Sequence, residues 1–264
     1  MNAPFVKMHG LGNDFIIFDQ RQNRREITPE LAARLADRRL GVGCDQIIQL
    51  VAPDYLAHAQ MLIYNSDGSQ AEMCGNAARC VAKYLRQVMN LPTETLTLQT
   101  LAGLIHIQPG VDGLESVDMG IPVYGKPGES ITTGSGTGYQ FTQVSMGNPH
   151  CVIFLPDLTD FPLDVEGPKL EVHKRFPHRT NVEFVQVINP QQIRMRVWER
   201  GVGITPACGT GACAAGVAAV LNGHTQRQVV VTLDGGDIDI FWRRDDHVIM
   251  TGPATTSFYG EINF

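Results

Sequence analysis

Two cysteines are each followed by a glycine and then by a run of small residues. Cys74 precedes Gly75-Asn76-Ala77-Ala78, and Cys208 precedes Gly209-Thr210-Gly211-Ala212. A thiol at a helix N-terminus can have a pKa well below its free value of ~8.5, close to the neutral range where acid–base catalysis works best. Glycines in a first helical turn let backbone N–H groups approach an anion closely. Each segment is therefore predicted to be a helix that begins at an acid–base thiol.

The same setting occurs twice because the chain contains an internal repeat. Five segments of the first half recur in the second half, in the same order, shifted by about 131 to 136 residues. Gly12-Asn13, for example, leads into an apolar strand, as Gly147-Asn148 does later. The sequence therefore predicts two related halves, each presenting one thiol.

Two equivalent thiols are suited to proton transfer on opposite faces of one carbon atom. In racemisation or epimerisation one base removes the Cα proton, and a conjugate acid delivers a proton from the other side. Helix N-termini can hold the α-carboxylate and stabilise the negative charge that develops as the C–H bond breaks. No segment suggests a pyridoxal phosphate site, so we expect a reaction without a cofactor.

The other four cysteines, Cys44, Cys80, Cys151 and Cys213, are interpreted as small buried hydrophobic residues. No Cys-x-x-Cys pair occurs, and the spacing of Cys74 and Cys80 fits neither a zinc finger nor a zinc ribbon. We expect no metal site, and thiols rather than disulfides.

The predicted fold class is α/β (α+β), with two pseudo-symmetric domains that each wrap a curved mixed β-sheet around one apolar helix. Thr28 and Pro29 mark the start of an earlier helix as N-cap and first residue, and Asn90 marks the end of the helix that follows Cys74. The expected domains are 1–123, carrying Cys74, and 124–264, carrying Cys208, with the last residues packing back on the first domain.

Composition narrows the class of function. The formal net charge is −6, which argues against nucleic-acid binding through phosphate contacts. No signal peptide is recognised, and the apolar run 212–221 is too short to span a bilayer. We expect a cytoplasmic protein that binds neither nucleic acid nor membrane.

The motifs around these residues resemble those of diaminopimelate epimerase over nearly the whole chain. In the first half they are Lys7 to Phe15, Gly41 to Gln46, Tyr64 to Gly68 and Met73 to Arg79. In the second half they are Gly147 to His150, Arg179 to Glu183, Trp198 to Gly201 and Ala207 to Gly211.

The resemblance implies interconversion of LL- and meso-2,6-diaminopimelate in lysine and peptidoglycan precursor synthesis, in a cleft that closes over the substrate. It implies that Cys74 and Cys208 exchange acid and base roles with the direction of reaction, assisted by His150 and Glu199. The implied substrate contacts are Asn13, Gln46, Asn65, Gly75, Asn76, Asn148, Asn181, Glu199, Arg200, Gly209 and Thr210. Amides donate and accept on one short group, and Arg200 suits a bidentate grip on the distal carboxylate.

The resemblance also implies a homodimer, since many members of the family place an aromatic residue near the C-terminus at a dimer contact. The matching region is Ser257-Phe258-Tyr259, although which residue corresponds is open.

Two alternatives remain. The first is a proline or hydroxyproline racemase, which shares the fold and the paired cysteines but typically has histidine where this chain has Asn76. The second is a non-catalytic thiol-redox protein, which leaves the matched asparagines unexplained.

Overall fold

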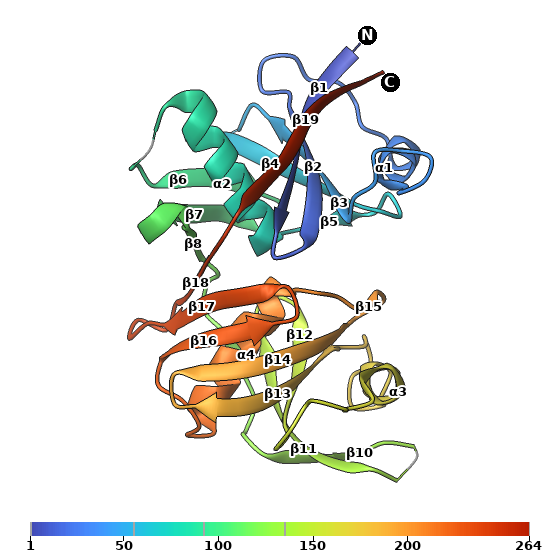
Figure 1. Ribbon diagram of the computed structural model, residues 1–264, viewed down its shortest axis with the longest axis vertical. Helices are drawn as coiled ribbons and strands as arrows, with labels where there is room; N and C mark the ends of the chain where they lie inside the picture. The colour runs from blue at the N-terminus through green and yellow to red at the C-terminus, as the bar shows by residue number, and fades with distance from the viewer. Residues whose placement is uncertain (1, 55, 92, 135, 264) are drawn as a thin grey trace. The chain divides into compact units, whose positions relative to one another are not determined.

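The computed structural model describes residues 2–54, 56–91, 93–134 and 136–263 (Figure 1). The chain forms two compact units. The first comprises Met1–Val117 together with Gly252–Phe264, and the second is Asp118–Thr251. The change between units therefore falls a few residues before the expected boundary at 123/124. The C-terminal strand belongs to the first unit because it pairs antiparallel with the N-terminal strand.

The first unit is a mixed sheet with strand order β19-β1-β2-β3-β4-β6-β7-β8. Only the β2–β3 and β4–β6 pairs of this order are parallel, and each of these connections contains a helix, as a crossover requires. The elements are β1 (Asn2–Gly10), β2 (Asn13–Asp19), α1 (Pro29–Ala36), β3 (Gln46–Val51), β4 (Ala59–Asn65), β5 (Gln70–Ala71), α2 (Gly75–Met89), β6 (Leu96–Thr100), β7 (Gly103–Pro109), a 3-10 turn (Val111–Gly113), β8 (Glu115–Asp118) and β19 (Thr255–Asn263).

The second unit repeats this plan in the order β10-β11-β12-β13-β14-β16-β17-β18. Its parallel pairs are β12–β13 and β14–β16, each again connected through a helix. The elements are β9 (Val123–Tyr124), β10 (Glu129–Thr132), β11 (Gly138–Ser145), β12 (Pro149–Phe154), α3 (Leu163–Glu171), β13 (Asn181–Asn189), β14 (Gln192–Glu199), β15 (Gly203–Ile204), α4 (Gly209–Leu221), β16 (Gln228–Leu233), β17 (Gly236–Trp242) and β18 (Val248–Gly252). The shared topology confirms the internal repeat and the predicted fold class.

Most helix limits follow local sequence chemistry. Thr28 caps α1 as predicted, its hydroxyl accepting a hydrogen bond from the Leu31 amide at 3.3 Å. Asn90 ends α2 in the left-handed conformation (φ 54°, ψ 47°), which asparagine tolerates better than most residues.

Helix α3 was not predicted, because Gly167 and Pro168 interrupt its sequence and both disfavour helix interiors. Packing explains the glycine, since a β-carbon there would lie 2.6 Å from Trp198 Cγ.

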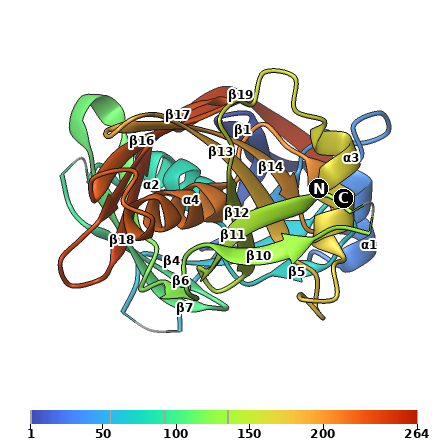
Figure 2. The same ribbon diagram turned by 90° about the horizontal axis from the view of Figure 1, so that it is seen from below.

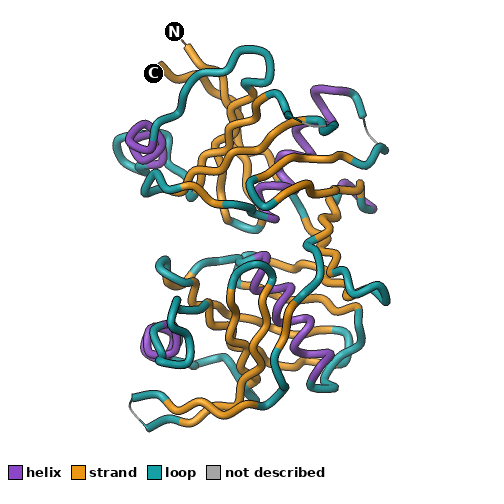
Figure 3. The backbone as a smooth tube through the Cα atoms, turned by 180° about the vertical axis from the view of Figure 1, so that it is seen from behind, coloured by secondary structure: helices purple, strands orange, loops and turns teal. Residues whose placement is uncertain are grey.

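Each unit is organised around its longer helix. Helix α4 lies inside the curve of its strands while α3 lies to the outside (Figure 2), and Figure 3 shows one long and one short helix beside the strands of each unit. All but a few of the α4 residues are buried, as its nearly continuous run of apolar and small residues requires. Within the described residues, no helix has the length and apolarity to cross a membrane.

Candidate active site

The candidate site residues of the first unit gather at the N-terminus of α2. Cys74 is the N-cap residue, with an extended backbone (φ −145°, ψ 112°) and a half-buried side chain. The next residues, Gly75 and Asn76, lie in the first turn, whose N–H groups have no acceptor within the helix. The aligned peptide dipoles make this end of α2 favourable for a thiolate or a carboxylate.

A line of side-chain amides extends from this turn. Asn76 donates to Asn13 Oδ1 at 3.1 Å, and Asn13 donates to Asp45 Oδ2 at 2.8 Å. From the other side, the wholly buried Arg79 donates to Asn76 Oδ1 at 2.9 Å and to the Pro253 carbonyl at 3.3 Å. Two expected substrate contacts, Asn13 and Asn76, are thus fixed to each other.

Asp14 and Asp45 anchor this line through a cluster of charges. Arg38 contacts Asp14 Oδ1 at 2.8 Å and Asp45 Oδ1 at 2.7 Å, and Lys7 Nζ lies 2.8 Å from Asp14 Oδ2. Burial alone would raise the pKa of Asp14, but hydrogen bonds from Arg38 and Lys7 and the charge of Lys7 outweigh it and hold that pKa well below its usual range. Asp14 is therefore ionised throughout the neutral range.

This cluster predicts a pH-dependent contribution to stability. A depressed folded pKa stabilises the protein fully above the unfolded pKa of ~3.9, and this stabilisation is lost as the pH falls from there through the folded pKa. We expect Asp14→Asn to lower the free energy of unfolding by about 1–2 kcal/mol at pH 7, and by clearly less at pH 2.

Urea unfolding at both pH values measures this prediction. Asp160→Asn, which changes an exposed carboxyl in the other unit, is the matched control. An Asp14→Asn difference that does not change with pH contradicts the assignment.

Gln46 and Asn65 form a second polar pair in the first unit. The antiparallel register of β3 and β4 places them opposite each other, and Gln46 Nε2 donates to Asn65 Oδ1 at 2.9 Å. Asn65 Nδ2 donates to Ser69 Oγ at 3.0 Å. Gln46 Oε1 is buried without a hydrogen-bond partner among the described residues, so this acceptor is available to a ligand donor.

The candidate site residues of the second unit gather at the N-terminus of α4. Cys208 is the N-cap residue, and its sulfur accepts a hydrogen bond from the Gly211 amide at 3.4 Å. Thr210 Oγ1 lies 3.6 Å from the same sulfur. Burial and the charges of Glu199 and Glu183 raise the pKa of Cys208 well above its free value, although the Thr210 and Gly211 hydrogen bonds oppose this. Cys208 is therefore a thiol, which can donate a proton.

Glu199 lies next to this thiol. It ends β14, and its carboxylate accepts hydrogen bonds from the Thr205 hydroxyl and the Cys208 thiol. Burial raises the pKa of Glu199, and the charge of Glu183 adds to this, against the two hydrogen bonds and the charge of His150. A carboxylate in hydrogen-bond contact with the thiol can influence the proton on Cys208.

His150 is connected to the same helix end through side chains. Its Nδ1 lies 2.7 Å from Glu183 Oε1 and its Nε2 lies 3.0 Å from Asn148 Oδ1. Asn148 Nδ2 donates to Thr210 Oγ1 at 3.2 Å. His150 and Glu183 are wholly buried, so their contact is shielded from solvent, whereas Asn148 and Thr210 are half-buried.

Asn181 and Arg200 complete the expected set in the second unit. Asn181 Nδ2 donates to the Pro149 carbonyl, and its Oδ1 accepts from the Arg200 amide, both at 2.9 Å. Asn181 is buried, whereas the Arg200 side chain is exposed, with Nη1 3.4 Å from the His178 carbonyl. Within this unit Asn148, His150, Glu199, Thr210 and Cys208 are thus brought together, while the Arg200 guanidinium lies apart from that cluster.

The remaining cysteines lie in the interior. Burial raises the pKa of Cys44 and of Cys80 to about 12, and that of Cys151 well above its free value. Cys213 is also wholly buried, in the middle of α4. All six cysteines are thiols.

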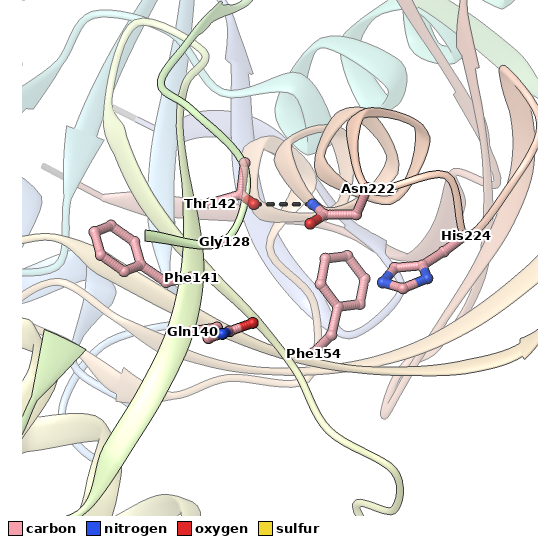
Figure 4. A pocket seen from close by; sticks show the side chains of 7 residues that line it. All are labelled: Gly128, Gln140, Phe141, Thr142, Phe154, Asn222 and His224. Carbon is pink, nitrogen blue, oxygen red and sulfur yellow. Dashed lines mark hydrogen bonds between the residues drawn. The ribbon is translucent and has the colours of Figure 1, made fainter. Parts of the chain in front are cut away.

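A small cavity of about 90 Å³ lies in the second unit, at the opposite end of α4 from Cys208 (Figure 4). Asn222, the C-cap residue of α4, donates to Thr142 Oγ1 at 2.9 Å, and the rings of Phe154 and His224 meet edge to face. Since α4 has 13 residues, the cavity is about 20 Å from the thiol along the helix axis. It does not belong to the cysteine site.

Sequence reasoning did not single out Glu183, Thr205 or Asp45 as parts of the site. For Glu183 a signal existed: it stands in the buried strand segment Asn181-Val182-Glu183-Phe184. An acidic residue is almost never fully buried without a partner. Thr205 and Asp45 lie outside the regular strands and helices, where no periodic pattern marks them.

Comparison with known proteins identifies the family. The family model described as diaminopimelate epimerase matches residues 5–125 and 142–257. A protein of that name from Pelotomaculum thermopropionicum is 50% identical, with 98% of this chain and 99% of the relative covered. The chain belongs to the diaminopimelate epimerase family. The resemblance inferred from the motifs is thereby confirmed.

Solved structures of other proteins share the fold of this diaminopimelate epimerase family member. A phenazine biosynthesis protein of the PhzF family from Bacillus anthracis matches with a TM-score of 0.78 at 16% identity, over 100% of both chains. A hydroxyproline epimerase from Agrobacterium vitis matches with a TM-score of 0.73 at 15% identity, over 99% of this chain and 91% of the other. At such identities the likeness concerns the fold alone.

Proposed function

We propose that this protein interconverts LL- and meso-2,6-diaminopimelate without a cofactor, as a step toward lysine and peptidoglycan precursors. The observation that carries the proposal is the nearly full-length match to relatives named diaminopimelate epimerase. The local structure supports it, since a thiol caps the equivalent helix in each unit.

In the proposed reaction Cys74 and Cys208 act on one Cα, as base and acid in one direction and with exchanged roles in the other. The base takes the Cα proton as a thiol proton, and the electron pair of the broken bond is held on the α-carboxylate. The acid thiol then delivers its proton to the opposite face and becomes a thiolate. First-turn amides of α2 and α4, at Gly75, Asn76, Gly209 and Thr210, stabilise the charge on the carboxylate.

The polar side chains of the two halves suit a substrate with two ammonium and two carboxylate groups. Gln46 Oε1, which has no hydrogen-bond partner among the described residues, and the Glu199 carboxylate provide acceptors for ammonium groups. Asn13, Asn65, Asn148 and Asn181 provide directed donors and acceptors, and the exposed Arg200 can pair with the distal carboxylate.

The proposal includes a homodimer that works in the cytoplasm. Phe258 and Tyr259 on β19 expose 49% and 66% of their surfaces, and an exposed aromatic pair favours a protein contact. A reducing compartment keeps the two reactive thiols from oxidation.

A chiral assay tests the proposed substrate. The reduced protein is incubated separately with LL-diaminopimelate and with L-proline, and the stereoisomers are separated by chromatography. We expect meso-diaminopimelate to accumulate to equilibrium and proline to stay L. The fold shared with a hydroxyproline epimerase makes proline the proper comparison, and inversion of proline alone would overturn the proposal in favour of that activity.

A further inference from the structure

The two units differ at one buried pair of positions beside the helix that carries the cysteine. In the first unit β2 and β3 pair in parallel with Phe15 opposite Gln46, and in the second unit β12 and β13 pair with His150 opposite Asn181. His150 thus stands where the first unit has Phe15, and Glu183 stands where it has Ile48. All four side chains are wholly buried.

The ionisable pair is not needed for the fold, because the first unit builds the same strands with two apolar residues. Glu183 carries a stability cost, since its Oε2 is buried without a hydrogen-bond partner among the described residues. Apolar residues in place of a buried ion pair are often neutral or stabilising. A carboxylate at this position therefore requires a reason other than stability.

The start of α4 is shaped to admit the carboxylate. The first unit has Ala77 three residues after its cysteine, whereas the second has Gly211. A β-carbon at Gly211 would lie 2.9 Å from Glu183 Oε1 and 3.2 Å from Cys208 Sγ. The glycine lets Glu183 lie directly beside the reactive end of the helix.

From Glu183 a continuous set of contacts leads to the sulfur. Glu183 Oε1 accepts from His150 Nδ1, because a carboxylate can only accept from the ring. Nδ1 therefore carries a proton, and Nε2–H donates to Asn148 Oδ1, which can likewise only accept. Asn148 Nδ2 in turn donates to Thr210 Oγ1. Thr210 in turn contacts Cys208.

We infer that Glu183 is a positioning residue, which holds the His150 ring by its Nδ1–H so that the Asn148–Thr210 contacts place the Thr210 hydroxyl against the Cys208 sulfur. This positioning role rests on the proposed function only for the expected loss of kcat. Glu183 acts through His150 and does not touch the reacting carbon.

Three substitutions separate positioning from packing. Glu183→Ile removes the acceptor, and we expect kcat to fall roughly 10–100-fold with KM changed less than about threefold, since small displacements at a reacting group have effects of this size. Glu183→Gln keeps an acceptor oxygen at the same place and is expected to retain most of kcat. Glu166→Gln, which changes another hydrogen-bonded carboxyl of the same unit, is the matched control and should leave kcat unchanged.

The double variant His150→Phe with Glu183→Ile copies the pair of the first unit, so it should fold with undiminished thermal stability while its kcat falls at least as far as that of Glu183→Ile. If Glu183→Ile itself does not fold, this variant still tests the inference. Full activity of the double variant would overturn it.

Nitrogen NMR of the full-length protein with labelled histidine supplies a readout independent of activity. The His150 signal is assigned by its loss in His150→Phe. We expect Nδ1 to carry a proton in the wild type and in Glu183→Gln, whereas in Glu183→Ile only Nε2, which donates to Asn148 Oδ1, should carry one. An Nδ1 proton that persists in Glu183→Ile would overturn the inference whether or not diaminopimelate is the substrate. The expected NMR pattern in a protein inactive on diaminopimelate would instead overturn the proposed function alone.

Discussion

Replacing Cys208 by alanine is expected to lower kcat for epimerisation by at least about 10³-fold, because one of the two proposed proton-transfer groups is lost. The same loss is expected for Cys74→Ala. Neither change should unfold the protein, since each cysteine is a helix cap whose backbone carbonyl accepts the first helical hydrogen bond, from Ala78 and from Ala212, both at 2.9 Å.

Each single variant should also keep a distinctive partial activity. The remaining thiol can still remove and return a proton on its own face, so in D2O one stereoisomer should exchange its Cα proton without inversion. The two variants should exchange opposite stereoisomers. Cys213→Ala, five positions after Cys208 in the same helix and wholly buried, is the matched control and should invert at the wild-type rate. If Cys208→Ala kept more than a tenth of the wild-type kcat, the two-thiol mechanism would be wrong.

Replacing Arg86 by alanine is expected to have the largest effect on stability, about 3–5 kcal/mol in the free energy of unfolding. Arg86 Nε lies 3.0 Å from Glu115 Oε1, and both side chains are buried. Its other nitrogens donate to the carbonyls of Leu91, Glu94 and Ile107. The variant would leave a buried carboxylate and three carbonyls without their donor.

The loss of unfolding free energy in Arg86→Ala should become smaller as the pH falls. Burial raises the pKa of Glu115, and Arg86 opposes that shift. Without Arg86 the pKa rises further, so the carboxyl takes up a proton as the pH falls and the penalty shrinks. The loss should be greatest near pH 8 and smaller at pH 5, measured by urea unfolding.

Arg21→Ala provides the control, because Arg21 forms a more exposed pair with Asp19 in the same unit, worth about 1 kcal/mol or less. A loss below about 1 kcal/mol for Arg86→Ala would contradict the role assigned to the buried pair.

The fold could be predicted from the sequence mainly because the chain contains an internal repeat. The Cys-Gly segments, the Asn13 and Asn148 turns and the following apolar strands recur in order, and each recurrence supports the other. Helix α1 was predicted from its Thr28–Pro29 start, whereas α3, its counterpart in the repeat, was missed because Gly167 and Pro168 hide the helical pattern. Gly167 packs against Trp198. Local sequence rules cannot predict this contact, because the two residues are far apart in the chain.

The site was harder to predict where function depends on contacts between distant strands. The register that brings Gln46 opposite Asn65 follows from strand pairing, and sequence alone did not specify it. Glu183 was overlooked because a single charge in an apolar strand gains meaning only when His150 is seen beside it. Comparison of the two halves could have indicated Glu183, since the equivalent position of the first half holds the apolar Ile48.

The fate of the substrate proton tests the account most directly. LL-diaminopimelate is converted by the reduced enzyme in D2O, and both product and recovered substrate are analysed by mass spectrometry and proton NMR in the first few per cent of reaction. Two thiols of opposite role predict that every meso product carries one solvent deuterium at the inverted carbon, while recovered LL substrate remains unlabelled at Cα. Meso product that retains the original Cα proton would require one group to remove and return it, and would contradict the paired action of Cys74 and Cys208.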